Sequence, residues 1–157
     1  MPMKNSILTK SISYKDFKKE ILNDYRNIVI SREASLLGRK EVLSGKAKFG
    51  IFGDGKELPQ VVMSHFFKDG DYRSGYYRDQ TLLMSQNLLS AREIFAAVYG
   101  HPDKLYEKMS GGRQMAGHFL TNTIDENNNW IDQTSQKNHI SDISPTASQM
   151  SRLVGLG

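Results

Sequence analysis

A long helical signal near the N-terminus constrains the fold of this chain more than any other feature. Ser13, followed three residues later by Asp16, has the form of a helix capping box. Apolar residues then recur at helical spacing along one face, at Phe17, Ile21, Tyr25 and Ile28. We predict that this helix continues to Leu37, that Gly38 marks its end or an irregularity, and that its aromatic side chains belong to a core rather than to a binding site.

The chain as a whole supplies few core-forming residues. Hydrophobic residues make up 38% of the 157 residues and charged residues 24%, and the mean hydropathy is −0.51. Soluble domains usually contain about 45–50% apolar residues, a count that includes glycine. A large self-sufficient core is therefore not expected.

Composition also excludes several classes of protein. The absence of cysteine excludes disulfides, thiolate catalysis and cysteine-ligated metal centres. No run approaches the ~18 apolar residues that span a bilayer, and residues 1–10 lack the apolar centre of a secretory signal. We expect a soluble, cytoplasmic protein without membrane partners.

The net charge of +4 and the pI near 9.2 raise the question of nucleic-acid binding. The basic residues of the first helix alternate with acidic ones: Lys15, Lys18 and Lys19 with Asp16, Glu20 and Asp24. Mixed charge of this kind is typical of a solvated helix face. We therefore do not expect a nucleic-acid partner.

Between residues 45 and 100 the sequence predicts short elements separated by glycine-rich turns. Residues 45–55 match neither a P-loop nor a dinucleotide fingerprint, and we interpret them as a turn-rich loop. Pro59 fits the first turn of a short helix, which residues 68–71 (KDGD) should end before an extended segment over residues 72–77.

A second capping box, formed by Ser90 and Glu93, predicts a helix that ends at Gly100 in a left-handed conformation. Residues 110–145 show little periodicity, so we expect them to be mostly loop. Loops of this length are uncommon, and ordered ones are often functional.

Three segments carry a family resemblance. We name them the tyrosine segment (residues 75–79, GYYRD), the histidine loop (residues 112–118, GRQMAGH) and the proline segment (residues 142–149, DISPTASQ). In this order, with the predicted helix near residues 91–100 between the first two, they resemble the alpha subunit of the thiamin-diphosphate-dependent branched-chain 2-oxo acid dehydrogenases. The resemblance runs from about Gly55 to the C-terminus.

The resemblance implies a cofactor site in the tyrosine and proline segments. Tyr77 and Arg78 would contact the diphosphate of thiamin diphosphate, and Ser144 and Thr146 would lie against the cofactor. A guanidinium can bind phosphate oxygens through two parallel hydrogen bonds, and a phenol adds one more donor. Without the family match, a tyrosine at a strand end beside a surface arginine is the ordinary interpretation.

By the same resemblance, the proline segment would hold a monovalent cation, usually potassium. Its ligands would be the carbonyls of Ile143 and Pro145, the Ser148 hydroxyl and the Gln149 side chain. A serine-rich turn that caps a helix beginning near Ala147 is the alternative, and both can hold together.

His118 would lie near the substrate end of such a site. There a neutral imidazole could shuttle a proton or orient a carboxylate, with a purely structural histidine as the alternative. The remaining histidines (His65, His101 and His139) have no metal-ligand spacing, so we assign them no metal.

Two departures from the family pattern are evident. Residues 55–59 read GKELP where relatives have Gly-Gln-Glu-Ala. The acidic Gly-Asp/Glu-Gly motif, followed about thirty residues later by the Asn that anchors magnesium and diphosphate, is not found; residues 53–55 (GDG) precede the tyrosine segment instead of following the proline segment. Magnesium ligands are therefore not expected in this chain.

The resemblance implies an α/β fold: an incomplete N-terminal portion of a thiamin-diphosphate-binding fold, helix-rich with long loops. Residues 1–44 would form a helical extension, and residues 45–157 the first, truncated part of the cofactor-binding domain. We expect such a fragment to be at most partly folded on its own.

The implied activity is the oxidative decarboxylation of branched-chain 2-oxo acids, with transfer of the acyl group to lipoyl. Implied partners are a beta subunit, or a fused beta part, and the lipoyl-bearing acyltransferase of the complex. The glutamate that activates the cofactor belongs to the beta part in this family, so the chain alone should be inactive. The alternatives are a non-enzymatic basic binding module and a regulatory or remnant fragment that docks on a beta subunit.

Overall fold

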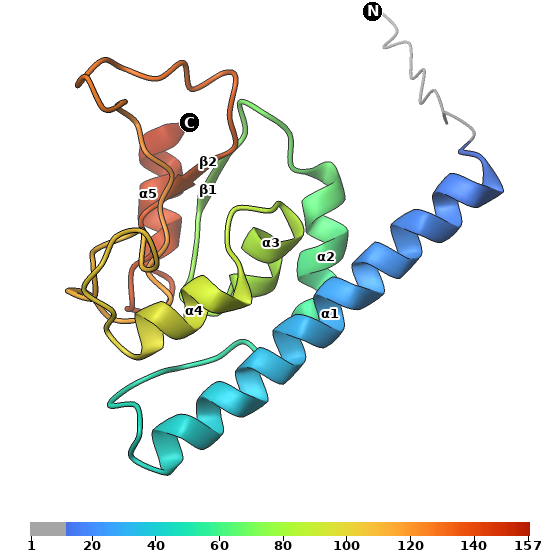
Figure 1. Ribbon diagram of the computed structural model, residues 1–157. Coiled ribbons are helices and arrows are strands. Elements are labelled where there is room, and N and C mark those ends of the chain that lie inside the picture. Colours follow the sequence, from blue (N-terminus) through green and yellow to red (C-terminus); the bar gives the residue numbers. More distant parts are fainter. Residues whose placement is uncertain (1–11) are drawn as a thin grey trace, which may run out of the picture.

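The computed structural model describes residues 12–157 and shows a helix-rich chain with one small sheet (Figure 1). Its elements follow in the order α1 (Tyr14–Leu43), α2 (Glu57–Phe66), β1 (Tyr72–Ser74), α3 (Gln80–Ser85), α4 (Ala91–Val98), β2 (Asn138–Ile140) and α5 (Ser148–Leu156). Helix α1 runs obliquely along one side, and α5 lies on the opposite side of the sheet from it (Figure 1).

Helix α1 begins as the sequence predicts, because the Ser13 hydroxyl accepts a hydrogen bond from the backbone amide of Asp16 at 3.1 Å. The prediction that the apolar face of this helix is buried in a core is wrong, however. Phe17 is 50% exposed, Ile21 49% and Tyr25 65%. The N-terminal end of α1 projects past α2 (Figure 1), whose last turn reaches Glu20 and Asp24 through His65. Helical periodicity fixes which residues share a face, but it does not say whether anything covers that face.

The prediction for Gly38 is also wrong, because α1 continues through it to Leu43. Gly38 is buried against the ring of Phe52, and a Cβ at this position would overlap that ring. The glycine therefore makes room for a close contact between α1 and the loop that follows it, rather than ending the helix.

Polar side chains fill the contact between α1 and α3. The hydroxyls of Ser31 and Thr81 lie 2.7 Å apart, and Gln80 donates to the Ser35 hydroxyl at 2.6 Å. All four residues are buried. A fully hydrogen-bonded polar contact needs little apolar surface, which helps to explain how the chain folds with so few hydrophobic residues.

An ion pair joins α1 to the start of α2. Arg32 holds the Glu57 carboxylate through two hydrogen bonds, of 2.6 and 2.8 Å, and the Gly55 amide donates to the same group. The Arg32 bond, despite partial burial, lowers the Glu57 pKa to about 2. Glu57, within the segment that departs from the family pattern, is thus engaged in holding α2 on α1.

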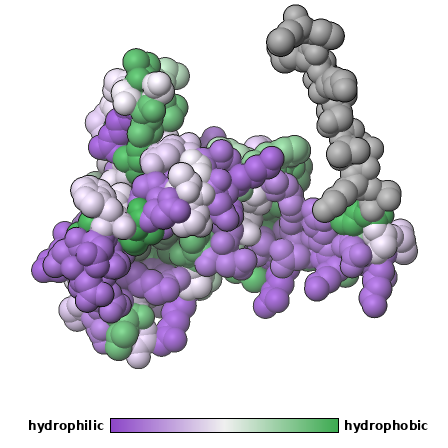
Figure 2. All heavy atoms as spheres, turned by 90° about the horizontal axis from the view of Figure 1, so that it is seen from above, coloured by the Kyte–Doolittle hydropathy of each residue, from purple (hydrophilic) through white to green (hydrophobic). Residues whose placement is uncertain are grey.

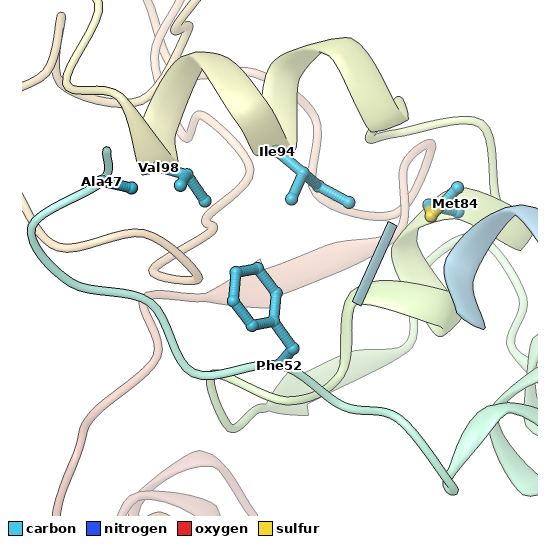
Figure 3. Packing of buried hydrophobic residues seen from close by; sticks show 5 residues of the cluster. All are labelled: Ala47, Phe52, Met84, Ile94 and Val98. Carbon is cyan, nitrogen blue, oxygen red and sulfur yellow. The ribbon is translucent and has the colours of Figure 1, made fainter. Parts of the chain in front are cut away.

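The hydrophobic core lies between α4 and the loop after α1. It is built from Ala47, Phe52, Met84, Ile94 and Val98. Figure 3 shows the Phe52 ring directed at the side chains of α4. Ile30 and Val42 of α1 pack against the edge of this cluster. The predicted α4 is confirmed in detail, with both hydrogen bonds of the Ser90–Glu93 capping box present and Gly100 at a φ of +65°.

Strands β1 and β2 pair in parallel, with Tyr72 opposite Asn138, Arg73 opposite His139 and Ser74 opposite Ile140. The extended segment expected over residues 72–77 is therefore a strand only as far as Ser74. Residues 110–145 are mostly irregular, as predicted, apart from β2 and one bridge between Ile124 and Trp130. The sheet brings β1 beside a segment that lies more than sixty residues further along the chain.

The surface mixes charged groups with separate apolar residues. The face shown in Figure 2 is mostly hydrophilic, and hydrophobic atoms reach the surface in several places. Within residues 12–157, no helix combines the length and apolar character needed to cross a bilayer.

The domain boundary at residue 44 stays a prediction. Helix α1 ends at Leu43, and Ser44 caps it, while the first eleven residues of the expected extension lie outside the described residues. The second half of α1 packs on the core of residues 45–157.

We predict that Gly38→Ala destabilises the protein by about 1–3 kcal/mol, because a new Cβ must displace the buried Phe52 ring. The matched control is Gly155→Ala in α5, where a Cβ meets nothing within 4 Å. That substitution should be neutral or stabilise by up to ~1 kcal/mol, as is usual for glycine replaced in a helix. Urea denaturation followed by circular dichroism measures both; equal effects would contradict the proposed packing.

Candidate functional site

The structure places the tyrosine and proline segments beside each other. The Tyr76 hydroxyl donates to the Tyr77 hydroxyl at 2.7 Å and lies 3.4 Å from the Thr146 hydroxyl. Because a phenol has one proton, Thr146 must donate in the second contact. A chain of three hydroxyl groups thus connects two of the residues assigned to the cofactor site, Tyr77 and Thr146, which lie far apart in sequence.

The two tyrosines differ in how firmly they hold their protons. Its hydrogen bond with Thr146, and then its hydrogen bond with Tyr77, lowers the pKa of Tyr76. Hydrogen bonding with Tyr76 raises the pKa of Tyr77. Of the pair, Tyr77 therefore stays protonated more firmly and can act as a donor to an anion.

Arg78 is held through its backbone, and its guanidinium lies near the ring of Tyr77. The Gln60 side chain donates to the Arg78 carbonyl at 3.1 Å, and Gly53 lies so close to this carbonyl that a Cβ there would overlap it. The guanidinium carbon is 5.6 Å from the centre of the Tyr77 ring. The Arg78 Nε is buried and has no hydrogen-bond partner among residues 12–157.

His118 connects the histidine loop to the proline segment. Its Nδ1 lies 3.0 Å from the Met115 carbonyl, and its Nε2 lies 3.0 Å from the Ser144 hydroxyl. A carbonyl can only accept, so Nδ1 carries a proton. In the neutral imidazole, Nε2 then accepts the proton of the Ser144 hydroxyl.

The histidine loop is held in place by Glu107, a buried residue that the sequence analysis did not single out. Its carboxylate accepts hydrogen bonds from three backbone amides, those of Met109, Ser110 and Gly112, at 2.7–3.1 Å. Burial opposes ionisation of Glu107, but the amides of Gly112 and Ser110 outweigh it and lower the pKa. No pattern in the sequence distinguishes Glu107 from a surface glutamate.

Gly117 allows the histidine loop to approach the tyrosine segment. Its φ is +91°, and a Cβ there would lie 2.8 Å from the Tyr77 carbonyl. A residue with a side chain would be strained by the backbone conformation and would also push the two segments apart. The three segments that carry the family resemblance therefore meet at one place.

The residues assigned to a cation gather at the start of α5. The Gln149 amide donates to the Ile143 carbonyl at 2.9 Å, and the Ser148 amide donates to the Pro145 carbonyl at 3.3 Å. Both carbonyls keep a second lone pair, so the turn can still offer oxygen ligands to a hard ion. The helix begins near Ala147, as expected, but the expected serine cap is wrong, because the N-cap is Ala147 at a φ of +68° and no side chain caps the helix.

A small cavity lies behind the site. It is lined mostly by apolar side chains, and Tyr77, His118 and Asp142 contribute to its wall. Its volume of about 50 Å³ suits one or two water-sized molecules, whereas whole ligands occupy several hundred Å³. An extended ligand could therefore only lie outside this cavity, where the side chains of Ser144 and Thr146 are exposed.

The groups around Tyr77 fit a phosphate-bearing ligand. The guanidinium of Arg78, close to the Tyr77 ring, supplies a charged group, and the Tyr77 hydroxyl, which accepts from Tyr76, keeps its own proton to donate. Hydrogen bonds from a guanidinium to phosphate are short and about twice as strong as neutral hydrogen bonds. No group of three or more His, Asp or Glu side chains within residues 12–157 is arranged to hold a metal ion.

His139 is buried beneath the site and is neutral. The Arg73 guanidinium lies 3.1 Å from its Nδ1, and its Nε2 lies 2.7 Å from Oε1 of the Gln86 side chain, so Nδ1 accepts and Nε2 donates. Burial, followed by the charges of Arg73 and Lys137, lowers its pKa to about 3. Asp142 shows the opposite effect, since burial raises its pKa to about 6.

Comparison with known proteins gives a partial similarity. No protein-family model matches this chain. The chain is similar to the 2-oxoisovalerate dehydrogenase subunit alpha of Bacillus subtilis (strain 168), with 31% identity over 106 residues. These residues are 64% of this chain and 30% of the relative. The similarity is distant and points to the alpha subunits of 2-oxo acid dehydrogenases at the level of the family.

We predict that His139 makes the protein sensitive to acid. Its pKa is about 3 in the folded state and about 6.5 when unfolded, so the unfolded state takes up the proton first as the pH falls. The free energy of unfolding should therefore fall between pH 6.5 and about pH 3, by at most ~1.4 kcal/mol per pH unit. A His139→Gln variant lacks this loss.

The measurement is urea denaturation of both proteins from pH 7.5 to pH 4.5, read as the difference between them. Asp142 titrates in the same range with the opposite sign, because its folded pKa is raised. It is present in both proteins, so the difference isolates His139. Parallel pH profiles for the two proteins would contradict a neutral, buried His139.

Proposed function

We propose that this chain is part of the alpha component of a thiamin-diphosphate-dependent 2-oxo acid dehydrogenase, and that the tyrosine and proline segments together bind the diphosphate. The observation that carries the proposal is the chain of hydroxyl groups from Tyr77 through Tyr76 to Thr146, beside the guanidinium of Arg78. The partial similarity to a 2-oxoisovalerate dehydrogenase alpha subunit supports the same family.

In this proposal Arg78 and Tyr77 supply donors to the phosphate oxygens. Arg78 contributes a positive charge. Its backbone carbonyl accepts a hydrogen bond from Gln60 and packs closely against Gly53. Tyr77 contributes a phenolic proton that it holds firmly. Thiamin diphosphate, when bound, supplies the carbanion and electron sink for decarboxylation, and the protein supplies orientation and electrostatics.

His118 and Ser144 would act at the substrate end of the site. The imidazole is oriented by the Met115 carbonyl, and its Nε2 faces the Ser144 hydroxyl. This pair can hold a proton at Nε2 or at the hydroxyl oxygen without moving either side chain. That property suits the positioning of a carboxylate or the relay of a proton.

The oxygen-rich turn at residues 143–149 would hold a monovalent cation next to the diphosphate. Its carbonyls already accept hydrogen bonds from Gln149 and Ser148, so the ion would add to this turn or compete with its internal bonds. Carbonyl and hydroxyl oxygens favour a hard ion such as potassium.

A protein partner would complete the site. Ser144 and Thr146 face the surface, and the cavity behind them is too small for a cofactor. Large apolar side chains are exposed on three helices: Phe17, Ile21 and Tyr25 on α1, Phe66 on α2, and Met150 and Val154 on α5. A beta subunit or a fused beta part would cover the site and such side chains, since apolar patches often mark protein contacts.

The proposal also covers the substrate class and the acceptor of the acyl group. The relative is named for 2-oxoisovalerate, a branched-chain 2-oxo acid, and acyl transfer to a lipoyl-bearing acyltransferase would follow decarboxylation. The chain spans about 30% of the length of that relative.

The test is calorimetric titration of the chain with thiamin diphosphate and, separately, with thiamin, which lacks the phosphates. We expect binding of the diphosphate form alone. Arg78→Gln should weaken it by about 10- to 100-fold, because a charged hydrogen bond contributes roughly 1.5–3 kcal/mol. The matched control is Arg26→Gln on the exposed face of α1, which should bind like the wild type. Equal affinity for thiamin, or an unchanged Arg78→Gln, would contradict the assignment.

A second test concerns turnover. The purified chain should not decarboxylate a branched-chain 2-oxo acid in the presence of thiamin diphosphate, because the activating glutamate of this family belongs to the beta part. Release of carbon dioxide by the chain alone would overturn this expectation.

Binding to DNA or RNA that weakens steeply between low and moderate salt would instead favour a basic binding module.

A further inference from the structure

A buried arginine lies beneath the point where the segments of the site meet. Arg73, in β1, is 5% exposed. Its Nη2 donates to the Asp79 carboxylate at 2.6 Å and to the Asp142 carboxylate at 3.4 Å. One guanidinium thus bonds two acidic residues that lie far apart in the sequence.

Each of the two acids belongs to one half of the proposed diphosphate site. Asp79 follows Arg78 and also accepts a hydrogen bond from the Tyr76 amide at 2.9 Å, so it closes the turn of the tyrosine segment. Asp142 is the first residue of the proline segment. Through these two acids, Arg73 joins the tyrosine segment to the proline segment.

The local backbone is built around this guanidinium. A Cβ at Gly75 would overlap the guanidinium group of Arg73. Gly75 does not have a positive φ, so its backbone conformation does not require a glycine. The available space requires a glycine, because the Arg73 guanidinium lies directly against the start of the tyrosine segment.

Charge explains why an arginine is needed at this position. The Asp142 side chain is 1% exposed and that of Asp79 30% exposed. Without a cation between them, one carboxylate would be buried unpaired and would face a second negative charge. Leaving a charge buried without a partner is strongly destabilising. His139, on the other side of the guanidinium, is neutral and accepts one of its hydrogen bonds.

We propose that Arg73 is a positioning residue, which sets the distance between the tyrosine and proline segments so that both can hold one diphosphate. This inference rests on the proposed function for its ligand. Arg73 itself contacts no ligand and acts through Asp79, Asp142 and the Tyr76 carbonyl, to which its Nη2 also donates at 3.4 Å.

The experiment compares the wild type with Arg73→Gln, Gly75→Ala and Val61→Ala in the full chain. Gly75→Ala keeps the arginine but displaces it. Val61→Ala removes buried apolar volume from α2 and controls for a general loss of stability. Two quantities are measured for each protein: amide hydrogen exchange, residue by residue, and the dissociation constant for thiamin diphosphate.

We expect Arg73→Gln and Gly75→Ala to speed exchange at least tenfold at the amides of Tyr76, Asp79 and Ser148, with much smaller changes in α1 and α4. Thiamin diphosphate binding should weaken at least tenfold in both. Val61→Ala should speed exchange across the helices and leave affinity for the folded protein within about threefold of the wild type.

Three results would overturn the proposal: unchanged exchange in the tyrosine and proline segments, a uniform increase like that of Val61→Ala, or a local increase with unchanged affinity. If the wild type itself binds no thiamin diphosphate, the proposed function fails. The exchange pattern then still shows whether Arg73 holds the segments together, and the idea that this serves a diphosphate site falls with the ligand.

Discussion

The arrangement of the site depends on one buried charge. Arg73 lies between Asp79 and Asp142, and the three groups cannot separate without leaving at least one of them buried and unpaired. Asp79 ends the tyrosine segment, which carries Tyr77 and Arg78. Asp142 begins the proline segment, which carries Ser144 and Thr146. The parallel pairing of β1 with β2 sets the same neighbourhood through the backbone, since Arg73 lies opposite His139.

Polar contacts also hold much of the remaining structure together. The hydrophobic cluster around Phe52 is small, and the contact between α1 and α3 consists of buried hydroxyl and amide groups. Such contacts are stabilising only when every member is hydrogen-bonded, which makes them specific. They suit a chain with 38% hydrophobic residues, and they leave apolar side chains such as Phe17 and Phe66 exposed.

Local signals in the sequence predicted local structure well. The Ser90–Glu93 capping box and the left-handed Gly100 follow from short-range hydrogen bonding and sterics, and both are present. Longer-range features could not be derived in this way. The apolar face of α1 was predicted, but its exposure depends on neighbouring elements, which helical periodicity does not encode. Gly38 does not interrupt the helix; a glycine is needed there because the Phe52 ring packs against it.

The candidate site shows the same division. The three segments were found through their resemblance to a family, whereas the contacts that join them were not visible in the sequence. Arg73 and Asp142 form no sequence motif, because 69 positions separate them. Glu107 forms none either, because its partners are backbone amides, which every residue type except proline provides. Buried ion pairs and carboxylates that cap loops become apparent only when the packing is known.

The central claim is that the tyrosine and proline segments form one anion-binding surface. It is tested most directly by titrating the isotope-labelled chain with inorganic pyrophosphate and following backbone amide signals by NMR. Signals from residues 76–79 and 143–148 should shift together, with one dissociation constant. Shifts confined to one of the two segments, or located mainly on the basic residues of α1, would contradict it.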